Sequence, residues 1–223
     1  MNEWNHEIQN ENEVQAAISA SRAENLGKWL GVLFWLVIPG IAGSLLSNQA
    51  VVSWLPFLYM PGRIIGMVTM CVYGYILLKL SSESGRYRMA ALCCLASAAV
   101  DAGSSLIPKD VSLAGLIGLL VFPMLILSLY GEYSEYMGHS EILQMPDEEM
   151  SVKWKRLWRW YIYSLGVMTG SVLLVMLSPV LGITALLVGT IGVLIAGVIK
   201  LIYLYRTAKI FREYAAERKQ QEI

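Results

Sequence analysis

The chain has 223 residues, of which 56% are hydrophobic and only 15% are charged, and its formal net charge is zero. Soluble domains usually carry about 25% charged residues, so this composition argues against a soluble globular protein. The balanced charge gives no reason to expect a nucleic-acid partner.

Residues 1–26 form a polar, acidic segment. The weak apolar spacing of Val14, Ile18 and Leu26 predicts a short surface helix or disorder there. Beyond it, long apolar stretches alternate with short charged islands, and each stretch approaches the roughly 20 residues that cross about 30 Å of hydrocarbon. The pattern predicts an all-α integral membrane protein, a bundle of six transmembrane helices with spans at about 28–46, 64–80, 89–107, 111–130, 157–177 and 180–205.

The distribution of lysine and arginine predicts the orientation of these spans. With a cytoplasmic N-terminus, 15 of the cations fall on the inner side, and only Arg63 and Lys109 fall outside. Cytoplasmic loops are enriched in such cations. We therefore expect a multi-pass protein of the cytoplasmic (plasma) membrane, with both termini inside. It would have a polar N-terminal segment (1–26), a membrane domain (27–205) and a cytoplasmic helical tail (206–223).

The third predicted span is the least apolar, and small residues dominate it. Of the 16 residues from Ala90 to Ser105, 12 are Ala, Cys, Ser or Gly, which favours close helix packing. Asp101 lies well inside this span, where an ionisable group suggests a functional site. A polar stripe at helical spacing shares its face, and its members are Cys94, Ser97, Asp101 and Ser104.

Arg63 begins the second span at the outer interface, and its long side chain can reach inward. We therefore predict an Arg63–Asp101 ion pair. A structural role, in which the pair holds two helices together, is the favoured interpretation. The alternative is that Asp101, Ser97, Ser104, Cys94 and Arg63 form an intramembrane polar site for a transported solute.

A basic and aromatic run begins at Ser151 and follows three acids, Asp147 to Glu149, that are typical of a helix start. Such runs suit the headgroup level of an anionic membrane. The candidate lipid contacts are Lys153, Lys155, Arg156, Arg159, Trp154 and Trp158.

The fifth and sixth predicted spans are separated only by Ser178 and Pro179, so they must form a tight hairpin. Small residues recur at four-residue spacing in both spans, which permits close helix approach. The pairs are Gly166 with Gly170, Ala185 with Gly189, and Gly192 with Ala196. We expect packing within the hairpin to use them.

The sequence nominates no catalytic motif, cofactor or metal site. Its two histidines, His6 and His139, lie outside the predicted spans, and no phosphate-binding loop or zinc motif occurs. The first functional hypothesis is thus a non-catalytic accessory or interaction module, in contact with lipid and with another membrane or cytoplasmic protein. The alternative is a small transporter, or a substrate-binding transport subunit, with its site around Asp101.

Overall fold

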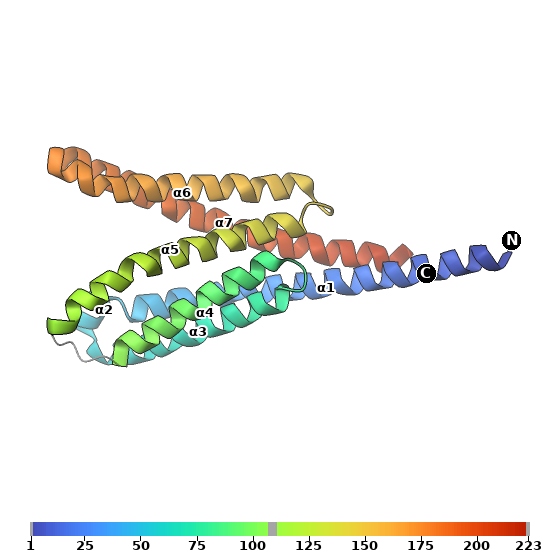
Figure 1. Cartoon of the computed structure of the whole chain (residues 1–223), viewed down its shortest axis with the longest axis horizontal. Helices are drawn as coiled ribbons and strands as arrows, with labels where there is room; N and C mark the ends of the chain where they lie inside the picture. The colour runs from blue at the N-terminus through green and yellow to red at the C-terminus, as the bar shows by residue number, and fades with distance from the viewer. Residues whose placement is uncertain (1, 107–110, 222–223) are drawn as a thin grey trace. The chain divides into compact units, whose positions relative to one another are not determined.

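The computed structural model describes the backbone of residues 2–106 and 111–221, and the side chains of residues 20–103 and 122–220. Over these ranges the chain is helical and contains no strand (Figure 1). The elements are α1 (Asn2–Leu46), α2 (Gln49–Trp54), the short 3-10 helix η1 (Pro56–Leu58), α3 (Tyr59–Leu80), α4 (Gly85–Leu106), α5 (Val111–Ile142), α6 (Glu148–Leu177) and α7 (Pro179–Gln221).

Four helical segments are long and apolar enough to cross a membrane among the residues with described side chains. They lie in α1, α3, α6 and α7, at the predicted first, second, fifth and sixth spans. The predicted third and fourth spans lie in α4 and α5, and both run into residues 104–121, whose side chains are outside the described part. The protein is therefore a helical membrane protein, and the count of six spans stays a prediction.

The chain divides into two compact units. The first, here called the α6–α7 unit, consists of Met1–Gly31 and His139–Ile223. The second, here called the α3–α4 unit, consists of Val32–Gly138 and so contains the second half of α1 and most of α5.

In the α6–α7 unit, the two long helices run side by side as a hairpin (Figure 1). Ser178 is the only residue between them. A methyl group added at Gly189 would lie 2.7 Å from the backbone nitrogen of Met168, so the helices touch there. Gly166 and Gly170 have open space instead. The expectation that this pair packs within the hairpin is wrong, because it faces away from α7.

The N-terminal part of α1 and the C-terminal part of α7 pack together in the same unit. A methyl group at Gly27 would lie 2.8 Å from Arg212 Cγ. Lys219 Nζ lies 2.8 Å from Glu24 Oε2. Helix α7 covers both the predicted sixth span and the residues expected to form the tail.

In the α3–α4 unit, α3 and α4 lie side by side (Figure 1). Glycines again mark close approaches between helices. A methyl group at Gly43 of α1 would lie 2.8 Å from the backbone nitrogen of Gly66 of α3. One at Gly131 of α5 would lie 2.8 Å from Cys93 Cβ of α4. These approaches bring α1, α4 and α5 around α3.

Helix α5 does not end where its apolar stretch ends. It continues through the polar residues after Tyr130 to Ile142, and Asp147 then caps α6, its Oδ1 accepting a hydrogen bond from Met150 N at 2.9 Å. The predicted helix start at Asp147 is confirmed. The polar extension stays helical because one side of it is buried, including Ser134, Tyr136 and His139.

Candidate functional site

The α3–α4 unit encloses a cavity of about 850 Å³. Its lining comes from α1, α3, α4 and α5. The polar and charged side chains in it are Ser44, Ser47, Tyr59, Arg63, Thr69, Tyr73, Cys94, Asp101, Glu132 and Glu135. A smaller pocket of about 130 Å³ shares Tyr73, Cys94, Glu132 and Glu135 with it and adds Ser97. Since the two share these residues, we treat them as one site, called the cavity below.

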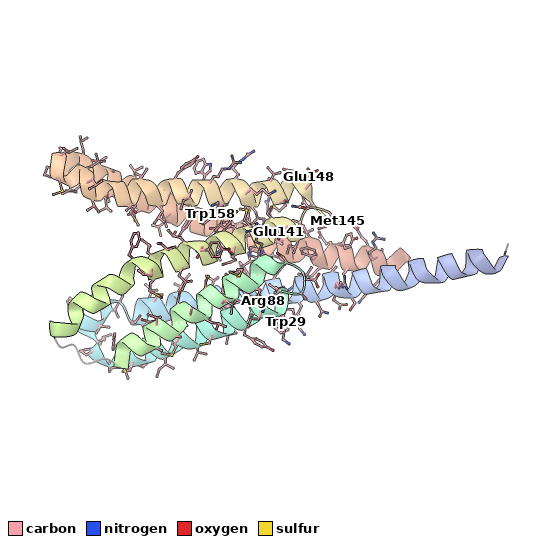
Figure 2. All side chains as sticks on the ribbon, viewed as in Figure 1. Trp29, Arg88, Glu141, Met145, Glu148 and Trp158 are labelled. Carbon is pink, nitrogen blue, oxygen red and sulfur yellow. The ribbon has the colours of Figure 1, made fainter. Side chains whose placement is uncertain are left out.

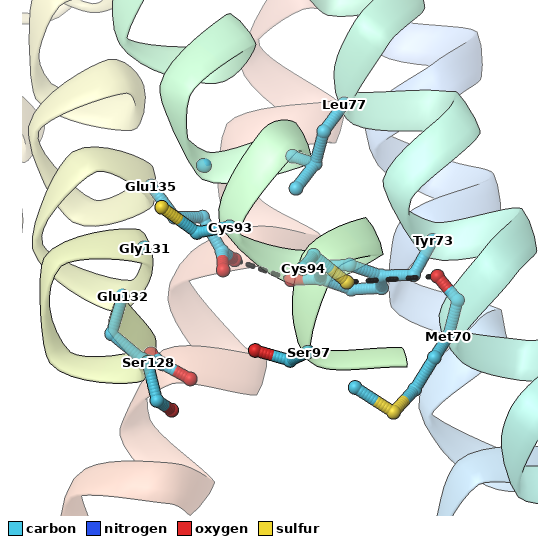
Figure 3. Close-up of a pocket in the computed structure, with 11 residues that line it drawn as sticks. Met70, Tyr73, Leu77, Cys93, Cys94, Ser97, Ser128, Gly131, Glu132 and Glu135 are labelled. Atoms are coloured by element: carbon cyan, nitrogen blue, oxygen red, sulfur yellow. Dashed lines mark hydrogen bonds between the residues drawn. The ribbon is translucent and has the colours of Figure 1, made fainter. Parts of the chain in front are cut away.

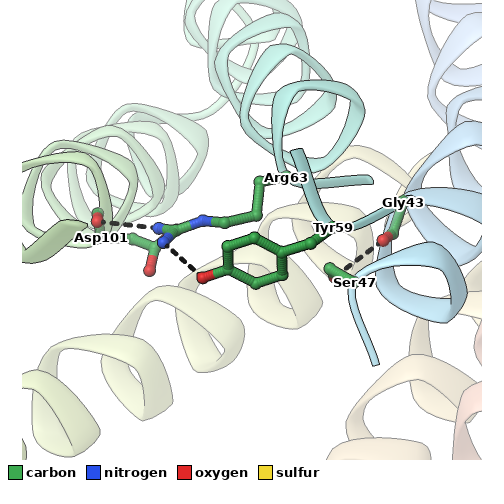
Figure 4. A network of polar contacts seen from close by, with 5 residues as sticks. All are labelled: Gly43, Ser47, Tyr59, Arg63 and Asp101. Atoms are coloured by element: carbon green, nitrogen blue, oxygen red, sulfur yellow. Dashed lines mark hydrogen bonds and ion pairs between the residues drawn. The ribbon is translucent and has the colours of Figure 1, made fainter. Parts of the chain in front are cut away.

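One end of the cavity is organised by Arg63 (Figure 4). Its Nη1 donates to Tyr59 Oη at 3.1 Å, one helical turn earlier in α3. Its Nη2 donates to Asp101 Oδ2 at 3.3 Å and to the carbonyl oxygen of Asp101 at 3.2 Å. The predicted Arg63–Asp101 ion pair is confirmed, and it joins α3 to α4 at this end.

The other end holds a buried glutamate (Figure 3). Tyr73 Oη donates a short hydrogen bond to Glu135 Oε1, joining α3 to α5. Only 4% of Glu135 is exposed. Tyr73 follows Arg63 by ten residues, which is about 15 Å along α3 at 1.5 Å per residue. The cavity thus extends between two polar contacts that both start from α3.

Glu132 lies one turn before Glu135 on the same helix and also lines the cavity. The neighbouring Tyr133 ring is covered by the guanidinium of Arg86 from α4, 5.6 Å from the ring centroid. A cation therefore lies near this end of the cavity, although it is not part of the lining.

The polar stripe of α4 reaches the cavity in part. Cys94 lies in both parts of the lining, and its Sγ donates to the carbonyl oxygen of Met70 at 3.6 Å (Figure 3). Ser97 lines the smaller part, and Asp101 the larger. The side chain of Ser104 lies outside the described residues. Asp101 is 64% exposed, so the stripe does not turn inward along its whole length.

Sequence reasoning missed Tyr73, Glu132 and Glu135. It ended the fourth span at Tyr130 and treated the following residues as a cytoplasmic connection. The available signal was the pair of glutamates at i and i+3 directly after an apolar helix, which places both on one side if the helix continues.

The basic and aromatic run occupies the first turns of α6. Lys153 Nζ lies 2.6 Å from Glu149 Oε1, and this hydrogen bond and the lysine's charge lower the pKa of the Glu149 carboxyl. Lys155, Arg156 and Arg159 are exposed. Trp158 is half-buried beside Tyr161, with ring centroids 5.7 Å apart; Figure 2 labels it on α6.

Trp154 corrects the sequence interpretation of this run. Its side chain has no exposed area, so it does not contact lipid headgroups. Its Nε1 donates to Thr207 Oγ1 of α7 at 3.1 Å, and its ring stacks on His139 with centroids 4.4 Å apart. Trp154 lies inside the α6–α7 unit because the face of α6 that it shares with Met150, Ser151 and Leu157 is the buried one.

No protein family, curated protein or solved structure matches this chain. Among the described side chains, no three His, Cys, Asp or Glu residues are grouped closely enough to hold a metal ion. The inference of function therefore depends on the chemistry of the cavity. Its lining carries three carboxylates and one guanidinium, together with hydroxyl, phenol and thioether groups, a combination that suits a small solute with a positive charge and an apolar body.

Proposed function

We propose that this protein is a small membrane transporter, or the solute-binding subunit of one, and that the cavity of the α3–α4 unit holds the solute. The observation that carries the proposal is the set of ionisable side chains lining one cavity between apolar helices. Ionisable groups at membrane depth commonly mark solute or ion paths.

The proposal includes the topology expected from the sequence. Six spans, with α4 and α5 as the third and fourth, keep both termini in the cytoplasm and leave only Arg63 and Lys109 outside. The membrane is the cytoplasmic (plasma) membrane. In this orientation Arg63 and Asp101 lie toward the outer face, and Tyr73 with Glu135 lie toward the inner face.

The solute class that we propose is a small organic cation. Asp101, Glu132 and Glu135 line the cavity, whereas Arg63 is the only cationic residue in the described lining. Tyr73 and the methionines Met67 and Met70 add surface that is favourable for a cation with apolar substituents.

Water access is the first test. Single cysteines at Ser97 and Glu132 are introduced after Cys71, Cys93 and Cys94 are replaced by alanine. We expect both to react with a membrane-impermeant maleimide in permeabilised membranes. A cysteine at Val100, which is 40% exposed on the lipid side of α4, serves as the control and should not react. Protection at both lining positions would contradict the transport proposal.

Binding is the second test. We expect tetraethylammonium, but not benzoate, to raise the melting temperature of the purified full-length protein. Glu132→Gln and Glu135→Gln should reduce that rise, while Glu141→Gln, on α5 but outside the cavity lining, should leave it intact. Equal stabilisation by both probes would overturn the cationic class.

The accessory-module hypothesis has one observation in its favour. Helices α1 and α7 extend beyond the predicted spans and pack on each other through Gly27–Arg212 and Glu24–Lys219, a surface on which a partner protein can dock. Co-purification from mild detergent tests it: a stoichiometric partner that is lost when Glu24→Lys and Lys219→Glu are each introduced would favour this function over transport.

A further inference from the structure

The first turns of α6 and the middle of α7 bring unpaired cations to one level of the hairpin. Trp154 fixes the register, because it hydrogen-bonds Thr207 at 3.1 Å and its ring lies 5.8 Å from that of Tyr203. Lys155 and Arg156 follow Trp154 directly, and Arg206 directly precedes Thr207. The two helices therefore carry these cations side by side.

We call the exposed residues Lys155, Arg156, Arg159 and Arg206 the basic surface. Within the described part of the chain, none of the four is in an ion pair. The nearest acids along the helices are already engaged: Glu149 with Lys153 at 2.6 Å, and Glu213 with Lys209 at 3.4 Å. The positive charge of the basic surface is thus not neutralised by the protein.

Aromatic and apolar side chains border the basic surface on its side toward the hairpin turn. Trp160 is 61% exposed, Tyr163 is 72% exposed and Tyr205 is 54% exposed. Toward Ser178 the exposed side chains are aliphatic, ending with Met176 and Leu177 at 84% and 83%. Exposed aromatic rings between a cationic and an aliphatic zone are typical of the headgroup level of a bilayer.

We propose that the basic surface binds the headgroups of anionic phospholipids. The four cations stand where phosphate groups of the leaflet lie, and the exposed aromatic rings beside them sit at the glycerol level. Each lysine or arginine near a membrane surface adds to attraction for anionic lipid, and the arginines can bind phosphate oxygens in a bidentate way. This inference is independent of the cavity and of the transport proposal.

The test uses the purified full-length protein in detergent, to which phosphatidylglycerol or phosphatidylcholine is added. We expect phosphatidylglycerol to raise the melting temperature more, and to stay bound during native mass spectrometry. The triple variant Lys155→Gln, Arg156→Gln and Arg206→Gln should bind it about tenfold more weakly or worse. The matched control removes three cations elsewhere, by Lys79→Gln, Arg88→Gln and Lys209→Gln, and should retain the preference.

Two further arms keep the outcome decisive. Glycerol phosphate should give no stabilisation, and an effect equal to that of the lipid would overturn the proposal in favour of a free-phosphate site. Arg156→Lys with Arg206→Lys should keep most of the lipid preference, so it reports on binding even if the triple variant does not fold. An unchanged preference in a folded triple variant, or its loss in the control alone, would also overturn the proposal.

Discussion

Arg63 and Asp101 join two helices, but the contact is asymmetric. Arg63 gives up three hydrogen bonds if it is replaced, to Tyr59 and to both the side chain and the backbone of Asp101. Asp101 gives up only one if its carboxylate is removed. Since its side chain is 64% exposed, we expect Asp101→Asn to cost less than about 1 kcal/mol, and Arg63→Gln to cost more than that.

Exchanging the two charges tests the electrostatic part of the contact. Arg63→Asp alone places two carboxylates together and should lower the yield of folded protein, whereas Arg63→Asp with Asp101→Arg should restore part of it. Fluorescence-detected size exclusion measures the yield. Lys209→Gln, which breaks the exposed pair with Glu213, should change nothing. If the double variant is no better than Arg63→Asp, the pair has no electrostatic role.

Thr207 accepts the hydrogen bond of a fully buried indole. Replacing it by valine keeps the shape of the side chain but leaves Trp154 Nε1 without its acceptor. A buried donor that loses its acceptor costs about 1–3 kcal/mol, so Thr207→Val should lower the melting temperature. Thr190→Val is the control, since Thr190 Oγ1 is exposed and bonds only to Leu186 O of its own helix. Equal melting temperatures would contradict this account.

At the scale of the helices, the α6–α7 hairpin distinguishes glycines that pack from glycines that do not. A side chain at Gly189 would meet the backbone of Met168 at 2.7 Å, which flexible side chains cannot relieve. Gly189→Leu should therefore separate the helices and cost about 1–3 kcal/mol. Gly166→Leu should be tolerated, because nothing lies within 4 Å of that position. Thermal unfolding in detergent compares the two, and a reversed order would show that the hairpin packs through the other face.

The apolar stretches identify helices from the sequence, but not which face of each helix is in contact. The sequence contains Gly166-x-x-x-Gly170 as clearly as Ala185-x-x-x-Gly189, and only the helix register decides between them. In the same way, Trp154 and Trp158 look equivalent in the sequence. One helical turn separates them, and the first is fully buried while the second is half-buried.

Helix α5 explains why half of the candidate site could not be found from the sequence. Arg63, Asp101, Ser97 and Cys94 stood out because they interrupt apolar segments. Glu132 and Glu135 follow such a segment, where acids are ordinary, and they gain significance only because the helix continues. Tertiary burial of Ser134 and Tyr136, not local propensity, stabilises that continuation.

At the scale of the whole molecule, the proposed topology makes a direct prediction. Fusions of green fluorescent protein should fluoresce at both ends of the chain, since both are proposed to be cytoplasmic. Alkaline phosphatase inserted after Ser53, in α2, should be active, because that segment is proposed to lie outside. Fluorescence at one end alone would require an odd number of spans and exclude six.

The single residue Ser178 between α6 and α7 has a consequence for how the chain is made. One residue cannot span a bilayer, so neither helix can cross while the other waits on the starting side. The ribosome must therefore have released most of α7 before α6 can settle, and the two helices enter the bilayer together. A nascent chain stopped after Leu177 should be extracted by alkaline carbonate more readily than one stopped after Tyr205.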